Sequence, residues 1–149
     1  MSKTISKKVS GKVSASNLVK AFRLMGINAQ QNAEIRLYAR KSESVSIALP
    51  PEALEQLGIK SAYRTGIGIN IDPGGQAEMR YDHANEAAVR TLAALLPGLS
   101  QIGAAAEDIQ KYLEMGFALK PHIDLENHEY GVFLEAKDQD QQRIGGAGW

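Results

Sequence analysis

The segment from Thr65 to Asp82 constrains the fold of this chain more than any other part of its sequence. Apolar residues alternate with small or polar residues on both sides of a turn signal, Asp72-Pro73-Gly74-Gly75. This period of two is typical of half-buried antiparallel strands. We therefore predict a β-hairpin at the centre of a small α+β domain. The residues expected on its buried face are Ile67, Ile69, Ile71, Ala77, Met79 and Tyr81.

Helices are predicted on both sides of this hairpin, from helical spacing of apolar residues and from capping signals. The longest is expected to break or kink at Pro97-Gly98, because proline removes a helical hydrogen bond. The exposed pair Glu107 and Lys111 has the spacing of an ion pair on one helix face. The expected helices run from a serine cap, Ser14 or Ser16, to Gly26, over 52–57, from the cap residue Asn85 onward, and over 103–115.

The remaining alternating stretches predict strands. Lysines in the first of them place it near a sheet edge, where charge deters stray pairing. The expected strands cover 4–13, 27–37, 45–49, the two arms of the central hairpin, and a closing hairpin of 117–125 and 130–136. Together these elements predict an antiparallel sheet of about five to seven strands covered on one face by two or three helices, a ferredoxin-like variant.

Length and composition suit one folded domain. The chain has 149 residues, of which 44% are apolar and 23% are charged, so it has enough apolar surface for one core. We expect residues 1–138 to form the α+β domain and residues 139–149 to form a polar, glycine-rich tail. The chain has no cysteine, and none of its apolar runs suits a membrane span or a signal peptide. The sequence therefore predicts a cytoplasmic protein without a membrane partner.

The charges are distributed unevenly although the net charge is zero. Nine basic residues and one acidic residue precede Ser42, so this part carries +8 and the rest of the chain −8. A basic face of this kind favours nucleic acid or an acidic protein as a partner. The alternative is that basic strands lie beside acidic strands and are neutralised within the fold. The candidate nucleic-acid residues are Lys7, Lys8 and Lys12, with the alternating face Arg36, Tyr38 and Arg40.

The tail contains a candidate protein interface. Its residues are Arg143, Ile144 and Trp149; glycines separate Ile144 from Trp149, which is the one tryptophan of the chain. Large aromatic side chains are costly to leave in water and are enriched as interface anchors. The sequence therefore predicts either docking of this segment onto a partner or a second copy of the chain, or a passive end.

Residues with catalytic or metal-binding chemistry are sparse. Asp82-His83 resembles part of an acid–base pair, but no nucleophile motif accompanies it, and capping of the following helix explains the aspartate better. His122 and His128 lie near acidic residues at a spacing that matches no metal-ligand motif. The stretch Gly66-Ile67-Gly68 does not lead from a strand into a helix as a phosphate loop does, so close packing explains its glycines. We predict no cofactor, no metal and no enzymatic activity.

Four stretches, taken in order, carry a resemblance to a known family. They are Asn32-Ala33-Glu34-Ile35-Arg36, Tyr63 with Gly66-Ile67-Gly68, Gly75 to Asp82, and Gly116-Phe117. They resemble a family of conserved hypothetical proteins first catalogued as a chloroplast open reading frame, with members in cyanobacteria, other bacteria and phages. That family tends to have tryptophan where this chain has His83, and the helical section 87–115 is longer here. The resemblance implies a fold and a small accessory protein, and it transfers no functional residue.

The sequence as a whole favours a non-catalytic accessory or adaptor protein that acts by binding a macromolecule. A protein partner or a second copy of the chain is the favoured partner, as for a subunit of a larger assembly or a phage-encoded inhibitor. Two alternatives stay open. One is a nucleic-acid-binding module that uses the basic N-terminal quarter, and the other is a small-molecule-binding or catalytic domain around the central hairpin.

Overall fold

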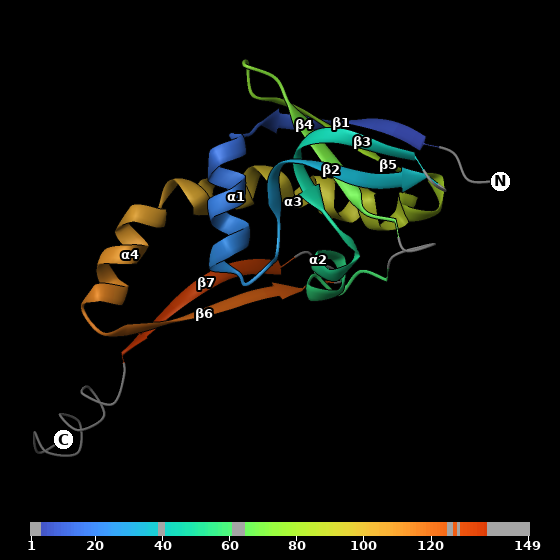
Figure 1. The fold of residues 1–149 in the computed structure, drawn as a ribbon. Coiled ribbons are helices and arrows are strands. Elements are labelled where there is room, and N and C mark those ends of the chain that lie inside the picture. The colour runs from blue at the N-terminus through green and yellow to red at the C-terminus, as the bar shows by residue number, and fades with distance from the viewer. Residues whose placement is uncertain (1–3, 39–40, 61–64, 125–126, 128, 137–149) are drawn as a thin grey trace, which may run out of the picture.

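The computed structural model describes residues 4–38, 41–60, 65–124, 127 and 129–136, which form a sheet, helices and a separate hairpin (Figure 1). The strands are β1 (Thr4–Lys12), β2 (Gln30–Tyr38), β3 (Lys41–Leu49), β4 (Ile67–Ile71), β5 (Gln76–Asp82), β6 (Phe117–Asp124) and β7 (Glu129–Ala136). The helices are α1 (Ala15–Leu24), α2 (Pro51–Gln56), α3 (Glu86–Ala104) and α4 (Ala106–Glu114), with a 3₁₀ turn η2 (His83–Asn85) before α3.

The main sheet has five antiparallel strands in the order β1-β5-β4-β3-β2. Strands β2 to β5 follow one another as neighbours, and β1 pairs with β5 at one edge, as the lysines of β1 predicted. Helix α1 carries the chain from β1 at one edge to β2 at the other. The α+β prediction is confirmed, whereas this strand order does not show the ferredoxin-like arrangement.

The β4–β5 hairpin lies at the centre of the sheet and of the core, as predicted. Ile69 is paired with Met79 on one side and with Ile47 on the other, and all three side chains are fully buried. The turn closes through Gly75 N, which donates to Asp72 O over 2.9 Å, with Gly75 at a φ of 87°. Only a residue without a Cβ adopts that backbone conformation without strain, so the turn signal in the sequence has its predicted role.

Helix α1 begins and ends at the predicted signals and packs closely on α3. The Ser14 side chain accepts a hydrogen bond from Asn17 N at 3.2 Å, and Gly26 ends the helix at a φ of 75°. A Cβ at Gly103 of α3 would lie 1.7 Å from Asn17 O, so the two helices approach at a glycine. This approach buries Leu18 completely between α1 and the rest of the core.

Of the break or kink predicted at Pro97-Gly98, the break is wrong, because α3 continues from Glu86 to Ala104. Leu92, Leu96 and Leu99 are fully buried on both sides of the proline. Burial of a leucine side chain is worth about 1.5–3 kcal/mol, so three of them outweigh the cost of about 3 kcal/mol for proline inside a helix. Packing therefore overrides the local signal.

The cap at the start of α3 also differs from the prediction. Asn85 occupies the cap position, but its side chain makes no capping hydrogen bond to α3. It donates instead from Nδ2 to Thr65 Oγ1 at 3.1 Å, in a buried polar contact. Asp82 caps the preceding 3₁₀ turn by accepting from Ala84 N at 2.8 Å, as predicted for that residue.

The β2–β3 arm folds over the face of the sheet that is turned away from α3. Gly66 N donates to Arg36 O at 2.9 Å, so β2 crosses the chain just before β4. Arg80 Nη2 of β5 contacts Glu43 Oε1 of β3 at 2.8 Å on the same side. Beneath this arm lies a second, smaller apolar cluster, separate from the main core. It contains Ile35, Leu37, Val45 and Ala48, with Ala33 beside it.

This crossing explains the glycines of the Gly66-Ile67-Gly68 stretch. A Cβ at Gly66 would lie 2.3 Å from Ile35 Cδ1, and a Cβ at Gly68 would lie 2.5 Å from Val45 Cγ1. Both distances are too short for non-bonded carbon atoms. The prediction that these glycines serve close packing is confirmed.

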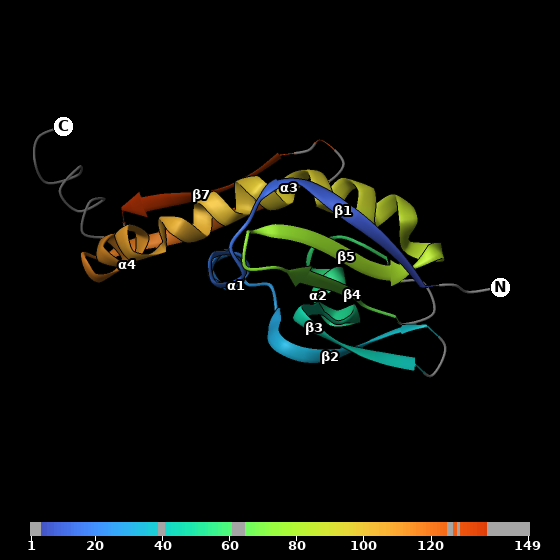
Figure 2. The ribbon, with the colours of Figure 1, turned by 90° about the horizontal axis from the view of Figure 1, so that it is seen from above.

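The closing hairpin β6–β7 forms a two-stranded sheet of its own and packs along α3 (Figure 2). Ile123 and Val132 contact the main core, and Tyr130 lies over Gly98, where a Cβ would come within 1.6 Å of its hydroxyl oxygen. Helix α4 joins α3 to this hairpin. Of the helices that the structure describes, none is long and apolar enough to cross a membrane.

Candidate protein-interaction surface

The large hydrophobic side chains left exposed in the described residues all belong to α4, its C-cap and the closing hairpin. They are Tyr112, Met115, Tyr130 and Phe133, which are 45%, 67%, 37% and 60% exposed. The large apolar side chains of the central hairpin and of the middle of α3 are buried, apart from the half-buried Ile71, so α4 and the closing hairpin differ from the rest of the molecule. Helix α4 and the β6–β7 hairpin therefore form the candidate binding surface.

Helix α4 exposes apolar residues because its buried stripe is narrow. Only Ile109 is buried in this helix. Leu113, four residues later on the same face, is half-buried, while Tyr112 and Met115 lie to the side of that stripe. The helix then ends at Gly116, which has a φ of 98°, and the chain turns into β6.

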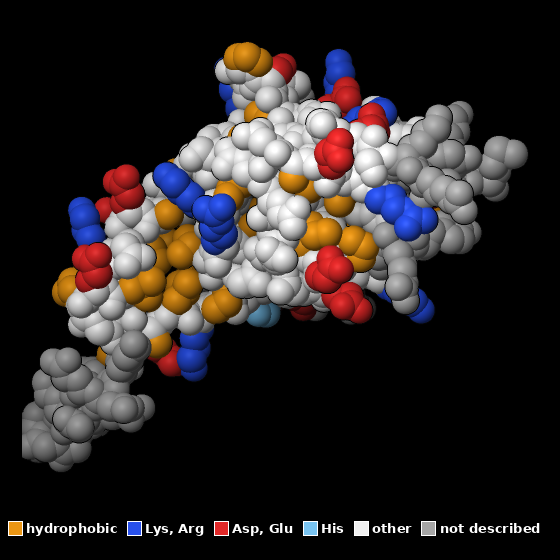
Figure 3. Space-filling view, viewed as in Figure 1, with side chains coloured by type: hydrophobic (Ala, Val, Ile, Leu, Met, Phe, Trp, Pro, Cys, Tyr) orange, Lys and Arg blue, Asp and Glu red, His pale blue; other side chains and the backbone are white. Residues whose placement is uncertain are grey.

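Aromatic packing holds the end of α4 against the start of β6. The rings of Tyr112 and Phe117 meet edge to face with centroids 5.5 Å apart. Such pairs contribute about 0.5–1.5 kcal/mol beyond the area that they bury. Tyr112 and Met115 are exposed on one side of the end of α4, and we call them, together with Phe117 and the half-buried Leu113 at their edge, the α4 patch. Figure 3 shows hydrophobic side chains gathered over α4 and the neighbouring part of β6.

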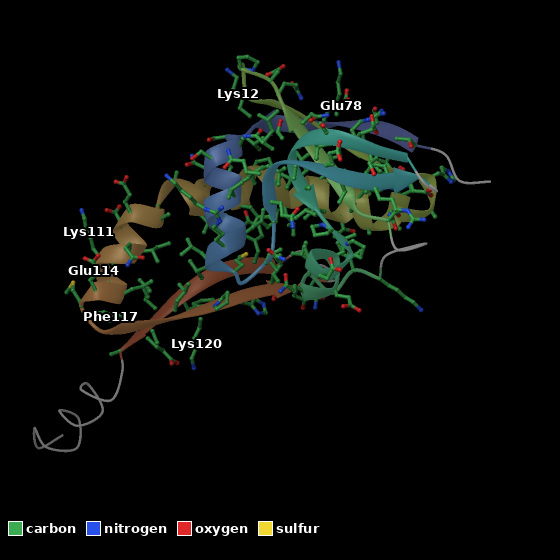
Figure 4. All side chains as sticks on the ribbon, viewed as in Figure 1. Lys12, Glu78, Lys111, Glu114, Phe117 and Lys120 are labelled. Atoms are coloured by element: carbon green, nitrogen blue, oxygen red, sulfur yellow. The ribbon has the colours of Figure 1, made fainter. Side chains whose placement is uncertain are left out.

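Charged side chains of both signs surround the α4 patch. Figure 4 places Lys111, Glu114 and Lys120 around Phe117 at this end of the molecule. Lys120 Nζ contacts Glu135 Oε2 at 2.8 Å across the hairpin. The predicted pair between Glu107 and Lys111 is wrong, because the structure pairs Lys111 with Asp108 at 3.8 Å, one residue closer in sequence. Exposed pairs of this kind add little stability, so the charges surround the patch without covering it.

The candidate nucleic-acid residues are not brought together on one strand face. Lys7, Lys8 and Lys12 lie on β1, and Arg36 lies on β2, at opposite edges of the sheet. Lys7 and Lys8 are neighbours in one strand, so their side chains point to opposite faces. The side chain of Tyr38 and the whole of Arg40 lie outside the described residues.

The alternative explanation of the N-terminal charge is that acidic strands neutralise it within the fold, and the sheet contains such a pairing. Lys8 of β1 is the register partner of Glu78 in β5. Arg80, also in β5, pairs with Glu43 of β3. Opposite charges directly across neighbouring strands stabilise a sheet by about 0.2–1 kcal/mol per pair. At Lys8 and Glu78 a basic residue of the N-terminal part therefore faces an acidic residue of the neighbouring strand, whereas Arg80 and Glu43 lie on strands that β4 separates.

The candidate interface residues Arg143, Ile144 and Trp149 lie outside the described residues. The structure does show where the segment that contains them begins. Strand β7 ends at Ala136, which is the register partner of Phe117 in β6. Ala136 therefore lies beside a residue of the α4 patch.

The residues weighed for catalysis or metal binding have structural partners. Asp82 is fully buried and caps η2 through Oδ1, while Oδ2 has no hydrogen-bond partner among the described residues; His83 beside it is exposed. His122 Nε2 lies 3.4 Å from Glu129 Oε2 across the hairpin, and His128 is outside the described residues. Within the part of the chain that the structure describes, no three acidic or histidine side chains gather as a metal would require.

A shallow hollow of about 420 Å³ lies beside the turn of the central hairpin. Its polar groups bond to neighbouring backbone. Asn70 Oδ1 accepts from Ser46 N at 3.1 Å, and Ser46 Oγ accepts from Ile71 N at 3.3 Å. Asp72 Oδ1 accepts from Gln76 N at 2.9 Å. These side chains continue the β3–β4 pairing and close the turn. The polar groups that line the hollow therefore stabilise the sheet.

Sequence reasoning missed Tyr112, Met115 and Phe133 as functional candidates. Tyr112 and Met115 are three residues apart, which places them on one side of α4, beside the buried Ile109 and the half-buried Leu113. Nothing in that spacing separates a buried residue from an exposed one. Comparison of the chain with protein-family models, with curated proteins and with solved structures finds no match.

Proposed function

We propose that this chain is a non-catalytic accessory or adaptor protein that acts by binding another protein through the α4 patch. The observation that carries the proposal is the exposure of Tyr112 and Met115 beside Phe117 in a chain whose other described apolar clusters are buried. Extended exposed apolar patches with a polar rim mark interaction sites on monomeric proteins.

The residue types of the patch support a protein as the partner. Aromatic residues and methionine are enriched in the centres of protein interfaces, and tyrosine is frequent among the residues that dominate binding energy. The rim of lysine, aspartate and glutamate side chains matches the polar ring around such centres. A nucleic-acid surface would instead concentrate bases, and the α4 patch has acidic residues next to its lysines.

The biological setting follows from the resemblance noted in the sequence. Small accessory proteins of that kind act as subunits of larger assemblies or, when phage-encoded, as inhibitors. Both settings require a binding surface and no chemistry, which agrees with the proposal. The proposal also includes a ferredoxin-like relationship of the fold and a cytoplasmic location of the protein.

The test compares two substitutions on the same helix segment with the same change of charge. Met115→Glu places a charge in the patch, and Gln110→Glu places one on an exposed position outside it. A partner is first identified by co-purification from the source cells and mass spectrometry, and its binding is then measured with both purified proteins. We expect Met115→Glu to weaken binding by about tenfold or more, as for a truncated interface anchor, and Gln110→Glu to leave it unchanged.

Two results would contradict the proposal. Equal binding by both variants would show that the α4 patch is not the site. Retention of the wild-type chain on heparin that falls with salt, together with absence of a protein partner, would favour the nucleic-acid alternative. In that case Arg36→Glu, combined with Arg40→Glu, is expected to abolish the retention.

A further inference from the structure

We propose that β7 is the docking edge for a second copy of this chain, so that two β6–β7 hairpins join into one four-stranded antiparallel sheet. This inference goes beyond the proposed function, because it uses the free edge and the outer face of the hairpin and none of the residues of the α4 patch. In the described chain neither β6 nor β7 pairs with a third strand. Figure 2 shows β7 at the periphery, on the far side of α3 from the main sheet.

The two edges of the hairpin differ in protection. Strand β6 contains Pro121, which has no N–H to donate, next to the exposed Lys120. Proline and lysine are the residues that natural proteins use to block pairing at a sheet edge. Strand β7 has the sequence EYGVFLEA, without proline or lysine and with three consecutive apolar residues, Val132 to Leu134. The unprotected edge is therefore that of β7.

The exposed phenylalanine of β7 points to the same conclusion. Tyr130 and Val132 face α3 and the core, so Phe133 points to the opposite face of the hairpin. There it is 60% exposed beside the ion pair of Lys120 and Glu135. Phe133 is the large hydrophobic residue on an otherwise polar face, and nothing in the described chain covers it.

A two-fold axis limits how two β7 strands can pair. Facing residues must lie on the same side of the sheet, so either Phe133 or Val132 faces its own copy near the middle of the strand. With Val132 at the centre, Glu129 would face Glu135 of the second copy, and like charges in that position are destabilising. With Phe133 at the centre, Glu135 faces Gly131, and the two phenylalanine rings cover each other. The register centred on Phe133 is therefore the self-complementary one.

The absence of cysteine from the native chain provides a direct test of this register. In the full-length variant Phe133→Cys, the two new thiols would face each other with Cα atoms about 4.5–5.5 Å apart. That separation lies within the range of about 4.4–6.8 Å that a disulfide spans. We expect most of this variant to form a covalent dimer in oxidised glutathione, seen on a non-reducing gel.

Two control variants lie on the same strand. Glu135→Cys shares the face of Phe133 but would lie four residues, about 13 Å, from its own copy, and is expected to stay monomeric on the gel. Val132→Cys forms a dimer only in the rejected register. Equal cross-linking at all three positions would indicate random collision, and cross-linking at Val132 alone would indicate the other register; either result overturns the proposal.

Sedimentation equilibrium of the cysteine-free chain completes the test. We expect the wild type to dimerise and Phe133→Glu to raise the dissociation constant at least tenfold, with an unchanged circular dichroism spectrum. Should Phe133→Glu fail to fold, Phe133→Ser takes its place in the same measurement. A wild type that stays monomeric at 0.2 mM, with no disulfide at position 133, would overturn the proposal. Because Met115→Glu leaves this edge intact, failure here is distinct from failure of the proposed function.

Discussion

Several residue types in this fold are explained by contacts with residues far away in the sequence. Gly66 lies just before β4 and Gly68 lies within it, and the side chains of Ile35 and Val45 that cross above them explain why both residues are small. Tyr81 is similar. Its ring is buried in the core, and its hydroxyl donates a hydrogen bond to Glu86 Oε2. Both cases yield predictions about stability.

Gly68→Ala is predicted to destabilise the chain by about 1–3 kcal/mol, because its new Cβ would overlap the Val45 side chain. The measurement is the free energy of unfolding in urea. Val45→Ala removes the overlapping methyl groups, so Gly68→Ala should cost less in that background than in the wild type. Equal costs in the two backgrounds would show that the β2–β3 arm does not press on β4.

Tyr81 gives a prediction about alkaline stability. Burial, together with the hydrogen bond from its hydroxyl to Glu86 and the charge of that residue, raises the pKa of Tyr81 from 10.0 to about 12, although Arg90 opposes the shift. Tyr81 makes its full contribution to the free energy of unfolding below pH 10, where its hydroxyl keeps the proton in both the folded and the unfolded state. Above pH 10 the unfolded state loses its proton first, so folding weakens until the pH passes the pKa of about 12 in the folded state.

The expected slope is about 1.4 kcal/mol of unfolding free energy per pH unit between pH 10 and 12. Tyr81→Phe cannot ionise and should lack this part of the slope, while every other titrating group is shared with the wild type. Urea melts at several alkaline pH values measure both proteins. Parallel curves for the two proteins would contradict the assignment.

At the level of elements, local signals predicted well where the local sequence decides the outcome. The Ser14 cap, the Gly26 stop and both hairpins lie where the sequence placed them, because caps and turns depend on a few adjacent residues. The prediction was wrong at Pro97 and for the Asn85 side-chain cap, where tertiary contacts outweigh local preference. The sequence did not predict that the β2–β3 arm folds over one face of the sheet. Alternation of apolar and polar residues predicts a strand, but it does not indicate which face of the sheet a neighbouring strand covers.

Helix α3 allows a test of the cost that packing overcomes at Pro97. Pro97→Ala restores a hydrogen bond to the helix, and proline in a helix interior costs about 3 kcal/mol. The lost contact is that of a half-buried ring near Gly11, worth about 1–1.5 kcal/mol at about 0.8 kcal/mol per methylene. We expect the variant to be more stable by about 1–2 kcal/mol in urea. A less stable variant would mean that the contact with β1 outweighs the helical hydrogen bond.

At the scale of the whole molecule, the apolar surface is divided into a closed part and an open part. The main core and the small cluster under β2–β3 are buried, while α4 and the closing hairpin expose Tyr112, Met115 and Phe133. The sequence predicted these elements, but not the open surface. The exposure of a side chain depends on which other elements pack against its helix or strand. The spacing of residues along α4 does not indicate which elements those are.

The central claim is that the α4 patch contacts a protein, and site-specific photo-cross-linking in the source cells tests it most directly. A photoreactive phenylalanine analogue replaces Met115 in one variant and Gln110, outside the patch on the same helix, in the other. We predict a covalent adduct to one defined protein from position 115, and none or only a trace from position 110. Adducts to nucleic acid, or the same adducts from both positions, would contradict the claim.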